Sequence, residues 1–140
     1  GSANSNGSTS PAASGYARRL TTRQGSAQGD WTMASIVFHD GKWTEGDPPL
    51  LSAMSHAVWL SSIVFDGARA FEGVTPDLDL HCARAIASCR AFAMNPTVTT
   101  EEMIEISREG VGKFPSDAEL YIRPMFWAKE GWIAPDPISS

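Results

Sequence analysis

The sequence predicts an α+β domain, in which an antiparallel β-sheet is covered by two helices. The predicted elements follow one another as strands first, then two helices, then one more strand. Such an order is typical of helices packed on one face of an antiparallel sheet, whereas parallel sheets require strands and helices that alternate. The 140 residues have room for one domain, or for one domain and a tail.

Residues 1–32 are predicted to be a disordered tail or a leader. They are mostly Gly, Ser, Ala, Asn, Thr and Gln, and Leu20 is the only large aliphatic residue before Met33. A segment of this composition cannot bury enough apolar surface to offset the entropy lost on ordering. A linker, an extension upstream of a native start at Met33 and an organelle transit peptide are the alternatives for this segment.

A hairpin and a longer strand are predicted to open the folded part. Residues 36–38 are apolar, the pair Asp40-Gly41 is a turn signal, and Trp43 lies on the return strand. Residues 55–73 are predicted to run from a helical turn into a buried strand. Alternation along that strand places Ile63, Phe65, Gly67, Arg69 and Phe71 on one face, and Val64, Asp66, Ala68, Ala70 and Glu72 on the other.

Two features of this strand are unusual. Gly67 weakens a strand interior, and such a glycine marks a bulge or the close approach of another group. Asp66 and Arg69 are costly on so apolar a strand unless they are paired or face a ligand. The alternation along this strand is equally consistent with a half-exposed strand whose charged residues, Asp66 and Arg69, face solvent.

The first helix is predicted over residues 80–94. Its apolar stripe is formed by Cys82, Ile86, Cys89 and Ala93, and the pair Asn95-Pro96 ends it. Just before this helix, Leu78 and Leu80 are interpreted as the end of a hairpin strand.

The second helix begins with a capping box from Thr99 to Glu102 and extends to Phe114. Its buried residues are predicted to be Met103, Ile106, Gly110 and Phe114. Residues 120–127 form the last strand, with Tyr121 and Arg123 on one face. Pro124 places that strand at a sheet edge or ends its regular pairing.

Composition excludes several classes of function. A net charge of −5 argues against nucleic acid and anionic membranes as partners, and no apolar run is long enough to span a bilayer. Cys82 and Cys89 lie about 10 Å apart in one helix, which is beyond disulfide reach. They are predicted to be reduced core residues of a cytoplasmic protein. The three histidines show no metal-ligand spacing, so no metal site is expected.

The residues left as candidates for binding a ligand are three arginines at positions where arginine is uncommon. Arg69 and Arg123 lie on predicted strands, and Arg84 lies in the first turn of a helix, three residues after His81. A cation in the first turn opposes the helix dipole, so a bound phosphate would explain Arg84. A solvated surface arginine is the simpler alternative.

Three segments resemble the class IV (fold type IV) pyridoxal-phosphate aminotransferases. Residues 55–69, with Val64-Phe65-Asp66-Gly67-Ala68-Arg69, are similar to the family's V-F-E/D-G-x-R segment. His81-Cys82-Ala83-Arg84 is similar to its H-x-x-R. Tyr121-Ile122-Arg123-Pro124 is similar to the Y-I-R-P of the branched-chain amino acid aminotransferases. The three segments are in the family's order and spacing over residues 33 to about 137.

The resemblance implies a cofactor, pyridoxal 5′-phosphate, and a role for each matching residue. Arg84 matches the arginine that binds the cofactor phosphate, and we expect it to face the same cavity as residues 65–69 and 121–123. Phe65 and Tyr121 match residues of the substrate pocket, and Arg69 and Arg123 match arginines that position carboxylates. Leu60 stands where branched-chain enzymes often have tyrosine, which leaves the preferred amino acid open. The implied substrates are a branched-chain or similar amino acid and a 2-oxo acid.

The family's Schiff-base lysine has no match here, so no catalytic residue is assigned. The lysines of the chain are Lys42, Lys113 and Lys129. The resemblance places the catalytic lysine in a second, larger domain. Residues 33–140 are therefore interpreted as an N-terminal small domain truncated before its last strand, with an incomplete sheet. We expect this fragment to be inactive alone and the complete protein to be a homodimer. The alternatives are a non-catalytic association or binding module, and a fragment of an aminodeoxychorismate lyase.

Overall fold

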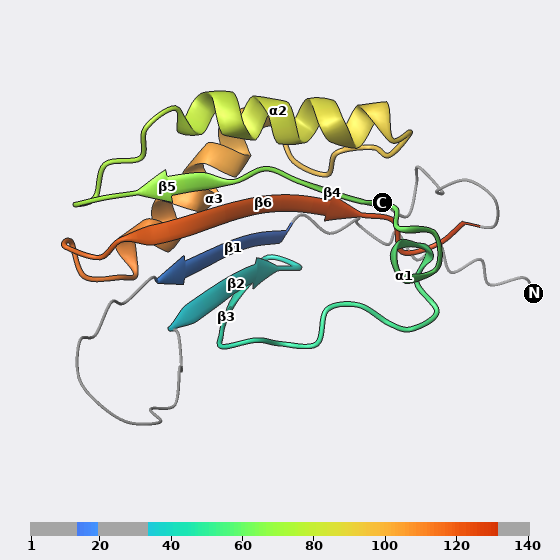
Figure 1. The fold of residues 1–140 in the computed structure, drawn as a ribbon, viewed down its shortest axis with the longest axis horizontal. Helices are drawn as coiled ribbons and strands as arrows, with labels where there is room; N and C mark the ends of the chain where they lie inside the picture. The colour runs from blue at the N-terminus through green and yellow to red at the C-terminus, as the bar shows by residue number, and fades with distance from the viewer. Residues whose placement is uncertain (1–13, 20–33, 132–140) are drawn as a thin grey trace, which may run out of the picture.

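The protein, analysed as a computed structural model described over residues 14–19 and 34–131, consists of a sheet and a layer of helices (Figure 1). The elements are β1 (Ser14–Arg19), β2 (Ser35–His39), β3 (Lys42–Glu45), α1 (His56–Leu60), β4 (Ile63–Phe65), β5 (Ala68–Ala70), α2 (Leu78–Ala91), α3 (Thr100–Gly112) and β6 (Leu120–Trp127). The strands pair antiparallel in the order β3-β2-β1-β6-β4, and β5 also pairs with β6. Helices α2 and α3 cover one face, which confirms the predicted α+β fold class.

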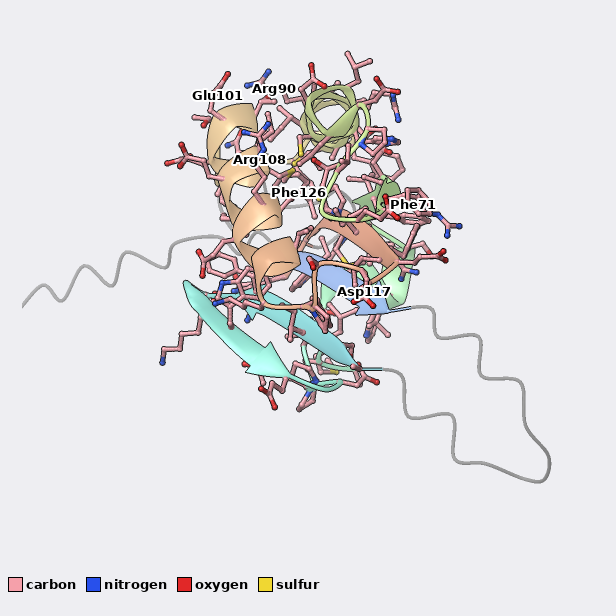
Figure 2. All side chains as sticks on the ribbon, turned by 90° about the vertical axis from the view of Figure 1, so that its left-hand side faces the viewer. Phe71, Arg90, Glu101, Arg108, Asp117 and Phe126 are labelled. Atoms are coloured by element: carbon pink, nitrogen blue, oxygen red, sulfur yellow. The ribbon has the colours of Figure 1, made fainter. Side chains whose placement is uncertain are left out.

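The main core fills the space between the sheet and helices α2 and α3. Figure 2 shows Phe126 of β6 in this layer, beside α3 and below α2, and its side chain is fully buried. Cys82 and Cys89 of α2 are buried and unpaired, and burial raises the pKa of each thiol to about 11. These thiols are therefore protonated core residues at neutral pH, as predicted.

The predicted hairpin is confirmed. Strands β2 and β3 pair with His39 opposite Lys42, so the loop is only Asp40 and Gly41. Both residues have positive φ, 49° and 73°, as a tight two-residue hairpin turn requires.

Helix α2 begins earlier than predicted, and the assignment of Leu78 and Leu80 to a strand is wrong. Both residues lie in the first turn of α2, after Asp77 in the left-handed region. Leu78 is 3% exposed and belongs to the same core cluster as Cys82, one turn further on. Leu78 is therefore buried because it lies on the face of α2 that packs against the core, and not because it belongs to a strand. Because α2 ends at Ala91, Ala93 lies beyond its stripe and is exposed.

The capping box that starts α3 is confirmed. The hydroxyl oxygen of Thr99 accepts from the backbone N–H of Glu102 at 3.2 Å, and the Glu102 carboxylate accepts from the Thr99 N–H at 2.7 Å. Within α3, Ser107 is buried and Ile106 is only half-buried, which differs from the prediction. The Ser107 hydroxyl donates to the Met103 carbonyl at 2.7 Å, so burying it leaves no polar group unpaired.

The prediction that residues 1–32 are all disordered is wrong for β1. This strand lies inside the sheet, between β2 and β6, with Tyr16 opposite Arg123. Composition reports on the apolar surface of side chains, but a strand is also held by backbone hydrogen bonds on both sides. Residues 1–13 and 20–33 lie outside the described residues. No described helix has the length and apolar character that a bilayer-spanning segment needs.

Candidate functional site

The long strand predicted after α1 is interrupted at Asp66 and Gly67. Strands β4 and β5 pair with β6 in one continuous register, since Phe65 lies opposite Met125 and Ala68 lies opposite Ile122. The interruption therefore lies opposite Pro124, which has no N–H to donate. Among the residues that the structure describes, the backbone bond made at this point runs from the Asp66 N–H to the Pro124 carbonyl, at 3.0 Å.

Strand β6 is thus an inner strand, and the prediction of a sheet edge at Pro124 is wrong. The alternative prediction, that Pro124 ends regular pairing, is confirmed. In a strand, the N–H and C=O of one residue point to the same neighbour. The donor that Pro124 lacks is therefore missing on the side of β4 and β5, whereas pairing with β1 continues past it.

Four predicted substrate residues come together on the second face of the sheet, which α2 and α3 do not cover. We call them the arginine wall: Phe65, Arg69, Tyr121 and Arg123. The guanidinium carbon of Arg123 lies 5.3 Å from the ring centres of both Phe65 and Tyr121. The guanidinium of Arg69 lies 5.6 Å from the Tyr121 ring centre. These distances are those of cation–π contacts, so the Tyr121 ring holds both arginines near one another.

Gly67 permits this arrangement. A Cβ atom at Gly67 would lie 2.6 Å from the hydroxyl oxygen of Tyr121 and 2.9 Å from a ring carbon, closer than van der Waals contact allows. The close approach predicted for Gly67 is confirmed, and the approaching group is the Tyr121 side chain. Any residue other than glycine at position 67 would displace the Tyr121 ring from its position against the strand.

An apolar groove of about 500 Å³ lies at the same face of the sheet. It is lined by Asp47, Pro48, Pro49, Leu50, Leu51, Ile63, Met125 and Trp127. Met125 pairs with Phe65, so the groove continues directly from the arginine wall. Sequence reasoning missed this groove because the loop at residues 47–51 contributes to it without any regular pattern. The only signal was that Ile63 shares a strand face with Phe65.

The wall and groove together suit a small molecule with a carboxylate and an apolar side chain. A guanidinium offers a planar fork of donors that matches the two oxygens of a carboxylate. The Phe65 side chain is 58% exposed, so an apolar surface is available beside Arg123.

Arg84 lies on the other side of the sheet, which corrects the expectation that it faces one cavity with the arginine wall. It projects from α2, and its Nε and Nη2 atoms donate to the Asp66 carboxylate at 2.9 and 3.1 Å. Nδ1 of His81 lies 2.6 Å from the same carboxylate. Asp66 alternates with Phe65 along the strand and so points toward the helices. Because α2 begins at Leu78, Arg84 lies in its second turn, and the prediction that it lies in the first turn is wrong. Its partner is the Asp66 carboxylate, whereas the sequence suggested a bound phosphate or solvent. A role of Arg84 in binding phosphate stays a prediction.

The pKa of the Asp66 carboxyl is lowered from its ordinary value of 3.8. Burial by itself raises this pKa, but hydrogen bonds from Arg84, His81 and the Gly67 N–H outweigh burial and lower it. The paired carboxylate therefore stabilises the fold above its unfolded pKa, and this stabilisation is lost as pH falls through the lowered folded pKa.

We therefore expect Asp66→Asn to lower the urea midpoint of unfolding at about pH 6, and to lower it much less at about pH 3. Chemical denaturation across this range measures the difference. A difference between the two proteins that stays constant with pH would contradict the charged pairing of Asp66.

Comparison with known proteins places these features in context. Residues 63–139 match the amino-transferase class IV family. A probable branched-chain-amino-acid aminotransferase of Rickettsia conorii is 32% identical over 100 residues, which cover 68% of this chain and 33% of that protein. A similar protein of Methanocaldococcus jannaschii, named a putative branched-chain-amino-acid aminotransferase, is 27% identical over 101 residues, 72% of this chain and 35% of that protein. The chain thus spans about a third of the length of the relatives it matches.

Two solved structures share the fold. An aminotransferase from Brucella abortus, bound to the cofactor PLP, is 50% identical, with a TM-score of 0.73 over 76% of this chain and 39% of that one. A branched-chain aminotransferase from Thermoproteus uzoniensis, with norvaline, has a TM-score of 0.64 at 23% identity, over 72% of this chain and 35% of that one, and supports the fold alone.

Proposed function

Because this chain belongs to the class IV amino-transferases, we propose that it is part of a pyridoxal-phosphate-dependent transaminase for branched-chain or similar amino acids. The observation that carries the proposal is the apolar groove beside the arginine wall. In this proposal the groove takes the side chain of the amino acid or 2-oxo acid, and Arg69, Tyr121 and Arg123 hold its carboxylate. The relatives named as probable branched-chain aminotransferases support this substrate class.

The cofactor would supply an electron sink for labilising the Cα–H bond of the amino acid. The arginine wall would orient the carboxylate, and Phe65 would exclude water from one side of the substrate. Arg84 is our proposed contact to the cofactor phosphate, because the Asp66 that it contacts lies between β4 and β5 at the outer edge of the sheet, where one bound molecule can reach both faces. Its Nε and Nη2 atoms are occupied by Asp66, whereas Nη1 lies on the other edge of the guanidinium, and the side chain is 56% exposed. Nη1 of Arg84 can therefore donate to a phosphate oxygen while Nε and Nη2 keep their hydrogen bonds to Asp66.

The catalytic lysine would come from a larger domain outside these residues, and the fragment would be inactive alone. Lys42 lies on edge strand β3, and Lys113 pairs with Glu109 at 3.0 Å at the end of α3. Lys129 follows β6 directly. The complete protein would be a cytoplasmic homodimer, in keeping with the unpaired cysteines of the core.

The test is a fusion in which this chain from Ser14 onward, so that β1 is included, replaces the matching segment of the Brucella abortus aminotransferase. We expect it to transfer the amino group of L-leucine to 2-oxoglutarate, and Arg123→Gln to raise KM for the 2-oxo acid roughly tenfold, as loss of one charge-assisted carboxylate bond implies. Arg90→Gln, at an exposed position in the last turn of α2, is the control. A fusion that folds and binds the cofactor but leaves leucine unreacted would contradict the proposal. Release of pyruvate from aminodeoxychorismate instead would favour the lyase.

A non-catalytic association module is the second candidate. Residues of and near α1 are apolar and exposed, with Met54 at 74%, Val58 at 51% and Trp59 at 63%. A patch of this kind is typical of a surface that another domain or subunit covers. Size-exclusion chromatography over a range of concentrations measures association of the isolated chain, and a monomer throughout would argue against this candidate.

A further inference from the structure

The cluster of Asp66, His81 and Arg84 lies directly behind the arginine wall, on the helix-covered face. We infer that Asp66 and Arg84 are positioning residues for the substrate carboxylate, which act through Gly67 on the Tyr121 ring. The inference rests on the proposed function of the wall.

The first step concerns the backbone at the interruption between β4 and β5. Pro124 cannot donate to this segment, so Asp66 and Gly67 are held to β6 by the bond from the Asp66 N–H to the Pro124 carbonyl and not by regular pairing. The Asp66 side chain takes over part of that task, because its Oδ1 atom accepts from the Gly67 N–H at 2.7 Å. The same carboxylate is anchored to α2 by Arg84 and His81. The position of Gly67 is therefore set by a helix on the far side of the sheet.

The second step leads from Gly67 to the wall. The Tyr121 hydroxyl and ring lie against Gly67 with no room for a methyl group. Tyr121 in turn contacts Arg69 and Arg123 through its ring. A shift of the Gly67 backbone must therefore move the ring against which both guanidinium groups are placed.

The third step is the strength of the anchor. The Asp66 side chain is only 15% exposed, and the Arg84 contact uses two donors on one carboxylate. Charge-assisted, two-point contacts fix direction as well as distance. Asn at position 66 keeps the shape and an acceptor for the Gly67 N–H, but it removes the charge that holds Arg84.

The experiment uses the 140-residue chain with labelled tyrosine rings, followed by NMR. The chain has two tyrosines, Tyr16 and Tyr121, so Tyr121→Phe assigns the signals. For Asp66→Asn and Arg84→Lys, we expect the Tyr121 ring signals to shift. We also expect the affinity for the probe 4-methyl-2-oxopentanoate to fall about five- to tenfold.

The matched control is Glu109→Gln, which removes a carboxylate that pairs with Lys113 at 3.0 Å on α3. We expect it to leave the Tyr121 signals and the probe affinity unchanged. The inference is overturned if Asp66→Asn and Arg84→Lys lower only the unfolding midpoint and leave both readouts as in the wild type. If Asp66→Asn does not fold, Arg84→Lys decides by the same readouts. A wild-type chain that does not bind the probe counts against the proposed function, while the Tyr121 signals still decide the inference.

Discussion

Replacing Phe126 by alanine is expected to lower the free energy of unfolding by about 3–5 kcal/mol. The Phe126 side chain is 0% exposed and lies between β6 and the two long helices, so its removal leaves a cavity that the sheet cannot fill (Figure 2). A loss of this size is a large part of the roughly 5–15 kcal/mol that stabilises a typical domain. Urea denaturation followed by circular dichroism measures it.

Phe71→Ala is the matched control. Phe71 lies just after β5, away from the helices in Figure 2, and is 43% exposed. We expect its replacement to cost less than about 1 kcal/mol, as for most substitutions outside the core. Equal losses for the two variants would contradict the position of the core between the layers.

Replacing Gly67 by alanine is expected to lower kcat/KM of the fusion with the Brucella abortus segment roughly a hundredfold. The added Cβ would lie 2.6 Å from the Tyr121 hydroxyl, so the ring has to leave its position between Arg69 and Arg123. A displacement of about 1 Å in a residue that positions substrate has an effect of this order. Steady-state kinetics with L-leucine and 2-oxoglutarate measures it.

Gly112→Ala is the control for the change of glycine to alanine itself. A Cβ at Gly112 meets no atom within 4 Å, and this glycine ends α3 on the helix-covered side. We expect unchanged kinetics. A Gly67→Ala fusion that keeps full kcat/KM would show that the position of Tyr121 has no bearing on the reaction.

Features that depend on a few neighbouring residues could be predicted from the sequence. The turn at Asp40-Gly41, the capping box of α3 and the alternation of Val64, Phe65 and Ala68 were all predicted correctly. Each arises from contacts or backbone preferences within about four residues. The convergence of the arginine wall followed from the same alternation, applied to two strands and combined with the family resemblance.

The partners of each strand and each charge were decided only by the tertiary structure. Composition could not place β1 between β2 and β6, because pairing depends on which strand edges the rest of the chain leaves available. The carboxylate that Arg84 contacts belongs to Asp66, and α2 reaches it only because that helix packs across β4 and β5. Local sequence determines which elements form and which face of each is apolar. The burial of apolar surface across the whole sheet determines which of them meet, and therefore which arginines share a site.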